Sequence, residues 1–148
     1  MPFSTAKAAE ILNYMFSKTS TTLTPPQYIY MGLSSNDPEA DNGTFTEISG
    51  NGYARVLVSI KGETYPDFIG SASGRTIQNT KQITFNKATA NWPNVKGFGL
   101  FTAATGGSPF YYAKVDSDNN PDGIIVTAGA VALLDPGSMK ISFATTDV

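Results

Sequence analysis

From residue 27 onward, clusters of Gly, Asn, Asp and Pro divide the sequence into short apolar or aromatic segments. Within these segments apolar residues recur with a period of two, which places them on one face of a β-strand. We predict strands at 28–33, 53–60, 83–85, 95–101, 110–115, 124–126, 130–134 and 139–143. Many short strands joined by turns are typical of an antiparallel β-sandwich or jelly-roll-like barrel. The expected fold is mainly β, with one such domain over residues 25–148.

The clearest hairpin joins segments 95–101 and 110–115. The turn between them contains Gly106 and Gly107, which supply the left-handed backbone conformations that hairpin turns need. We therefore expect these two strands to pair directly.

Three residues are unusual for their positions in strands. Gly97 and Gly99 predict either a bulge or a close approach of another backbone, and the bulge is favoured. Arg55 interrupts an otherwise apolar strand. Because an isolated buried charge is costly, it lies either at a solvent-facing edge or in a buried ion pair, within one subunit or between subunits.

Residues 1–24 are expected to form one short helix and a linker. Ser4 is a suitable N-cap, and the helix is expected to end near residue 18 because Pro25 prevents continuation. A helix of this length is marginal alone, so its apolar stripe needs a partner surface on this domain or on a neighbouring subunit. The candidate assembly contact consists of Ile11, Leu12, Met15 and Phe16.

The composition favours a surface that other subunits cover. Only 15 % of the 148 residues are charged, while 41 % are hydrophobic, so Ser, Thr, Asn and Gly supply much of the polar surface. The net charge of −2 and the absence of a basic stripe argue against nucleic-acid binding. No apolar run reaches the roughly 18–20 residues that span a bilayer, and no secretory signal is evident, so we expect cytoplasmic synthesis without membrane insertion.

The lack of His and Cys excludes most catalytic arrangements and the usual zinc sites. No pair of carboxylates stands out for glycoside hydrolysis, so we expect no enzyme activity and no cofactor or metal. The acidic segment 116–123 alternates oxygen donors, yet Pro121 replaces the glycine of an EF-hand and Thr127 replaces its last glutamate. A solvated loop is favoured there, and calcium binding stays an open alternative.

Aromatic residues near predicted strand ends offer a route to ligand binding. Trp92, Tyr65 and Tyr111 are the candidate ligand-facing residues, because sugars stack on exposed aromatic rings. The favoured alternative is that these rings pack in the core, with Trp92 anchoring the turn at Asn91 and Pro93.

Several stretches, in their order and spacing, resemble a family of small bacteriophage proteins described as tail-fibre-like virion components. The stretches that carry the resemblance are 30–38, 52–56, 83–85, 88–92, 95–101, Gly106-Gly107 and 139–143. The family is similar in beginning with a short helix and in lacking catalytic motifs.

The resemblance implies a virion structural protein, a fibre or decoration of the tail or head, made in the bacterial host cytoplasm. We expect it to self-assemble, with a trimer favoured, and to attach to other virion proteins by its helix and loops. The alternative is a carbohydrate-binding module that recognises a host surface glycan.

Overall fold

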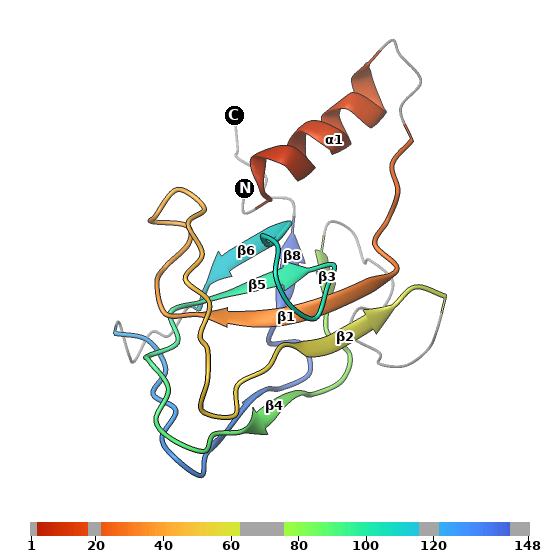
Figure 1. Cartoon of the computed structure of the whole chain (residues 1–148). Coiled ribbons are helices and arrows are strands. Elements are labelled where there is room, and N and C mark those ends of the chain that lie inside the picture. Colours follow the sequence, from red (N-terminus) through yellow and green to blue (C-terminus); the bar gives the residue numbers. More distant parts are fainter. Residues whose placement is uncertain (1–2, 18–21, 63–75, 116–121, 143–148) are drawn as a thin grey trace.

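The computed structural model describes residues 3–17, 22–62, 76–115 and 122–142 (Figure 1). These residues form one α-helix and eight short strands. The elements are α1 (Thr5–Phe16), β1 (Tyr28–Ser34), β2 (Val56–Ile60), β3 (Thr76–Gln78), β4 (Ile83–Lys87), β5 (Gly97–Phe101), β6 (Tyr111–Lys114), β7 (Val131–Leu134) and β8 (Lys140–Ser142).

The strands form one larger sheet and two ribbons, all antiparallel. The four-stranded sheet has the order β2-β1-β5-β6, while β3 pairs with β8 and β4 pairs with β7. The arrangement is mainly β and sandwich-like with one short helix, which confirms the predicted fold class.

The hydrophobic core packs against the four-stranded sheet. All five residues of β5 are buried, because β1 and β6 cover its edges and other segments cover both of its faces. Met31 of β1 pairs with Leu100 of β5 and Val56 of β2, so the centre of the sheet is apolar. The other buried hydrophobic residues around this centre include Leu33, Val58, Ile83, Phe85, Trp92, Val95, Val126 and Met139.

The predicted hairpin is confirmed, whereas the predicted bulge is wrong. Strands β5 and β6 pair in continuous register, and the turn has Gly106 at φ 70° and Gly107 at φ 68°. The register of β5 with β1 is also continuous. Gly97 and Gly99 are needed because a Cβ there would collide with the Pro38 ring and with Phe45, respectively.

Besides shifts of one or two residues at other strand ends, the structure differs from the predicted strands at three places. Strand β2 begins at Val56, three residues after the predicted start. Segment 124–126 forms only an isolated bridge, in which Val95 and Ile124 exchange two backbone hydrogen bonds of 2.8 Å. Strand β3 was not predicted.

Helix α1 is attached to the domain at its N-terminal end. The Ser4 side chain accepts a hydrogen bond from the Lys7 amide, as an N-cap does, and the Ser4 amide donates to the Phe110 carbonyl. The Phe3 ring meets Tyr111 edge-on at 5.2 Å. Beyond this attachment the helix projects away from the sheets (Figure 1), and it ends at Phe16. No helix in the described part of the chain is long and apolar enough to cross a membrane.

Candidate assembly interface

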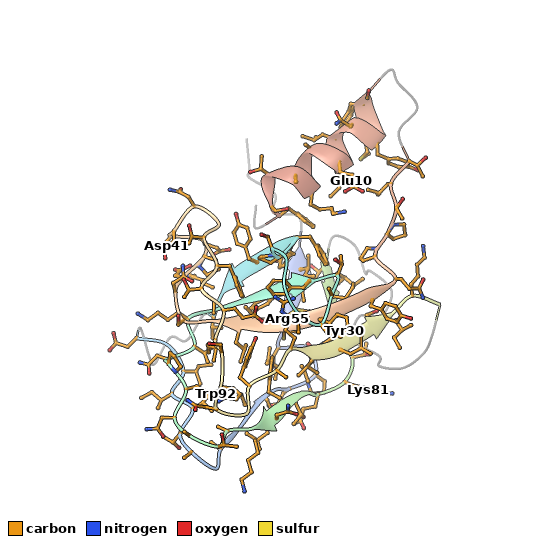
Figure 2. All side chains as sticks on the ribbon, viewed as in Figure 1. Glu10, Tyr30, Asp41, Arg55, Lys81 and Trp92 are labelled. Atoms are coloured by element: carbon orange, nitrogen blue, oxygen red, sulfur yellow. The ribbon has the colours of Figure 1, made fainter. Side chains whose placement is uncertain are left out.

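The apolar stripe of α1 is largely open to solvent. Leu12, Met15 and Phe16 are 57 %, 65 % and 75 % exposed, Ile11 is half-buried, and no residue of the helix is buried. Figure 2 shows α1, with Glu10 labelled, standing apart from the sheets. The domain therefore does not provide, among its described residues, the surface that this stripe needs.

The charged residues of α1 are not part of its apolar stripe. The Lys7 ammonium lies 2.6 Å from a carboxylate oxygen of Glu10, one helical turn away. Glu10 is two residues from Leu12, so the two side chains leave the helix in different directions. The stripe can be covered by another apolar surface without burying an unpaired charge.

A second apolar surface lies beside β7, and we call it the β7 patch. It consists of Ile124, Ile125, Val131 and Leu133, with exposed fractions of 44 %, 63 %, 43 % and 50 %. Val131 and Leu133 point outward because residues alternate along β7, while Ala132 and Leu134 pack against the core.

Two grooves of about 240 and 410 Å³ adjoin the β7 patch, and they share Ile124, Leu133 and Leu134 as walls. The smaller groove has a floor of core residues that includes Leu33 and Val95. The larger groove reaches Phe98 and Met139. The two grooves are therefore neighbours and together form the depression beside β7, in which the smaller groove is apolar and the larger one is also lined by Lys114, Asp135 and Lys140.

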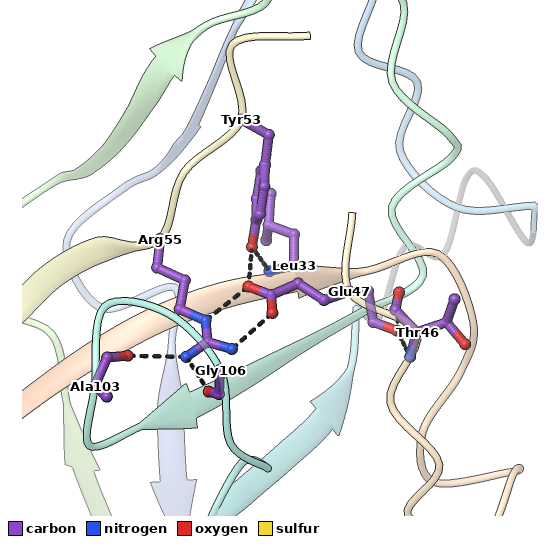
Figure 3. A network of polar contacts seen from close by, with 8 residues as sticks. Leu33, Thr46, Glu47, Tyr53, Arg55, Ala103 and Gly106 are labelled. Carbon is purple, nitrogen blue, oxygen red and sulfur yellow. Dashed lines mark hydrogen bonds and ion pairs between the residues drawn. The ribbon is translucent and has the colours of Figure 1, made fainter. Parts of the chain in front are cut away.

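Arg55 forms an ion pair within one subunit, in which its own side chain is buried and that of Glu47 is 29 % exposed, and this decides between the alternatives left open by the sequence. Its Nε and Nη2 atoms donate to the two carboxylate oxygens of Glu47 at 2.7 and 2.6 Å (Figure 3). Nη1 donates to the carbonyls of Ala103 and Gly106 in the β5–β6 turn. The Arg55 side chain is 3 % exposed, and its guanidinium lies over the Phe101 ring.

Tyr53 extends this network to β1. Its hydroxyl accepts a hydrogen bond from the Leu33 amide and donates one to Glu47. Burial raises the pKa of the Tyr53 phenol well above its ordinary value, and the Glu47 charge raises this pKa further. The network holds the turn against the sheet through hydrogen bonds that join Arg55, Glu47 and Tyr53 to one another and to the backbone.

Trp92 and Tyr111, two of the candidate ligand-facing residues, lie in the core, where each is only 4 % exposed. The Trp92 indole N–H donates to the Asn51 carbonyl at 2.9 Å, and its ring meets Tyr53 edge-on (Figure 2 labels Trp92). These contacts agree with the core-packing alternative. Tyr65 lies outside the described residues.

The acidic segment 116–123 falls mostly outside the described residues, so calcium binding there stays untested. In the part of the chain that the structure describes, no three His, Cys, Asp or Glu residues are grouped as a metal site would require.

The sequence found one of the two apolar surfaces. It identified the helix stripe, and it placed strands at 124–126 and 130–134 without indicating that their outer side is uncovered. The local signal for the β7 patch is the run Ile124-Ile125-Val126 followed by Val131-Ala132-Leu133-Leu134. A run of this kind predicts an apolar segment but not which of its faces is buried.

Comparison with family models identifies the family to which this β protein belongs. Residues 2–134 match the model of a family of phage fibre proteins. The chain belongs to this family, the podophage GP4 fiber I protein gp80 family. The resemblance predicted from the sequence is confirmed, and a virion structural role follows from it. No curated protein matches the chain.

Proposed function

We propose that this fibre protein acts without any covalent step, by self-association and by attachment to other virion proteins, and that residues 1–24 supply the contact. Residues 25–148 then form the β domain that the contact holds in place. The observation that carries the proposal is the open stripe of α1, in which Leu12, Met15 and Phe16 are all more than half exposed.

The energetics favour covering this stripe. Burying a large apolar side chain stabilises a structure by about 1.5–3 kcal/mol, so three such side chains provide a substantial part of a specific contact. A helix of 12 residues is also marginal without a packing partner. Assembly therefore stabilises both the contact and the helix that makes it.

A closed assembly gives every copy the same contact, and we propose a trimer. The subunits are proposed to be made in the bacterial host cytoplasm and then built into the virion. The absence of Cys fits this route, because no disulfide has to form.

The test is the mass of the purified protein in solution, measured by light scattering over a range of concentrations. We expect a stable oligomer that the double variant Ile11→Ala/Phe16→Ala dissociates. Asn13→Ala, an exposed polar position on the same helix, is the matched control and should leave the mass unchanged. A wild-type protein that stays monomeric, or an oligomer unaffected by the double variant, would contradict the proposal.

The alternative function is recognition of a host surface glycan. Because Trp92 and Tyr111 are buried, neither ring supports glycan recognition. A glycan-binding measurement on the same samples separates the two functions. An oligomer that binds no glycan supports assembly, whereas a monomer that binds glycan supports recognition.

A further inference from the structure

Among its described residues the chain has two exposed apolar surfaces on different elements, and we propose that they bind each other between copies. In this proposal, which rests on the proposed function, the stripe of α1 from one copy docks on the β7 patch of a second copy. The chain then contains both halves of its own assembly contact.

The two surfaces match in shape. Leu12, Met15 and Phe16 follow the i, i+3, i+4 spacing with which an amphipathic helix places anchors in an apolar groove. The depression beside β7 has two neighbouring grooves with Leu133 and Ile124 between them. An apolar anchor of the helix can therefore enter the smaller groove, whose lining is apolar.

The two surfaces also match in polarity. The stripe is uncharged because all of its side chains are apolar, and the two charged residues of α1, Lys7 and Glu10, pair with each other. Within the depression, charged residues occur only in the larger groove, as Lys114, Asp135 and Lys140. The smaller groove has only apolar side chains among its described lining residues. A helix bound there would bury apolar surface without leaving a charge unpaired.

The α1 stripe on the β7 patch comes from a second copy, because a copy's own α1 does not reach its own β7 patch. Figure 1 shows α1 and β4 at opposite ends of the molecule, and β7 pairs with β4. The hydrogen bond from Ser4 to Phe110 and the contact between Phe3 and Tyr111 hold the start of α1 at the β6 end. A copy cannot cover its own β7 patch with α1 while these contacts persist.

The contact joins two different patches, so it is heterologous. A heterologous contact produces a ring if its rotation closes and a filament if it does not. The proposed trimer is then a ring in which every stripe and every β7 patch is used once.

The absence of Cys allows a direct test by cross-linking. The single variants Met15→Cys and Leu133→Cys are mixed, with a mass tag on one of them, and treated with a short bismaleimide. We expect the mixed dimer to exceed both tagged and untagged homodimers. Asn13→Cys on the polar side of α1 and Ser49→Cys on an exposed loop are matched controls, and each should cross-link at least tenfold less.

The other outcomes separate this inference from the proposed function. Homodimers of Met15→Cys alone would show that helices pair with helices, which overturns the inference and leaves helix-mediated assembly standing. Homodimers of Leu133→Cys alone would show that patches pair with patches, which also overturns the inference. No cross-linking together with a monomeric mass would overturn both.

A second measurement does not depend on cross-linker reach. Leu133→Asp changes a half-exposed residue, so it should leave the fold intact by circular dichroism while weakening self-association about 10- to 100-fold. Phe16→Asp should have an effect of similar size. If Phe16→Asp dissociates the oligomer and Leu133→Asp does not, the β7 patch is not the docking site.

Discussion

Arg55 binds both carboxylate oxygens of Glu47 while its guanidinium lies 3.4 Å from the centroid of the Phe101 ring. One side chain thus joins the loop before β2, strand β5 and the turn that follows β5. Such a paired, planar arrangement depends on the fork of the guanidinium, which a lysine ammonium cannot reproduce.

We expect Arg55→Lys to destabilise the protein by about 2–3 kcal/mol, because it keeps the charge but loses the paired geometry and contacts to the turn. Urea unfolding measures this change. Lys7→Ala breaks the exposed pair with Glu10 and should cost less than about 0.5 kcal/mol. Equal losses of unfolding free energy for the two variants would show that the Arg55–Glu47 pair contributes no more than the exposed pair.

The sequence analysis identified Arg55 as unusual but could not identify its partner. The choice between a solvent edge and an ion pair depends on how loops 46–55 and 102–109 fold over the sheet, which is a tertiary property. By contrast, the α1 cap and the β5–β6 hairpin were predictable, because their signals are local: Ser4 before an apolar stripe, and two glycines between two strands.

The wrong prediction of a bulge at Gly97 and Gly99 has the same origin, a contact that depends on the tertiary structure. A glycine in a strand indicates that something needs space, and the sequence does not say whether that is a bulge or a neighbour. At Gly99 the neighbours are Phe45, which is distant along the chain, and Pro109, which lies across the turn of the same hairpin. Strand β3 was missed for a related reason, since its pairing of Ile77 with Ile141 is non-local.

Gly99→Ala is expected to destabilise the protein by about 1–3 kcal/mol through overpacking. An added Cβ would lie 2.8 Å from Phe45 Cε2 and 2.9 Å from the Cβ of Pro109. Unfolding free energies of Gly99→Ala, Phe45→Ala and the double variant form a cycle. If the cause is steric, the double variant should be more stable than the sum of the single changes predicts; additive costs would argue against it.

Asn79 is fully buried and connects the end of β3 to the turn between β7 and β8. Its side-chain amide donates to the carbonyls of Lys81 and Asp135, and its side-chain oxygen accepts from the Met139 amide. Asn79→Ala should cost about 2–4 kcal/mol, because buried backbone groups lose their partners.

Asn79→Asp should cost more than Asn79→Ala at neutral pH, since it turns a carboxylate toward two carbonyl oxygens. Gln82→Ala is the control, because the exposed Gln82 contacts the same Asp135 and should cost less than about 0.5 kcal/mol. Thermal and urea unfolding of the three variants give the ranking. An aspartate variant as stable as wild type would show that these hydrogen bonds contribute little.

Trp92 is the only tryptophan in the sequence, so its fluorescence reports on this one site. The emission of the folded protein should be blue-shifted relative to the unfolded protein and poorly quenched by acrylamide, because the indole is 4 % exposed. Glycans should leave the spectrum unchanged. Strong acrylamide quenching in the folded state would restore the ligand-facing interpretation.

Tyr53 and Tyr111 should make the protein less stable at alkaline pH. Burial raises the pKa of Tyr111 to about 12, with a smaller contribution from the charge of Glu39, and raises that of Tyr53 further. An unfolded tyrosine has a pKa near 10, so above that pH the unfolded chain loses protons that the folded chain keeps. The free energy of unfolding is therefore unaffected by these groups below about pH 10 and falls as pH rises from 10 toward 12.

Each of the two phenols contributes a slope of up to about 1.4 kcal/mol per pH unit in this range. Urea unfolding at several values between pH 8 and 11.5 measures the slope for wild type and for Tyr111→Phe. Because phenylalanine cannot ionise, the free energy of unfolding of the variant should fall less steeply with pH. The difference in slope should be about the contribution of one proton. Parallel curves for the two proteins would show that Tyr111 ionises equally easily in the folded and unfolded chains, contrary to its buried position.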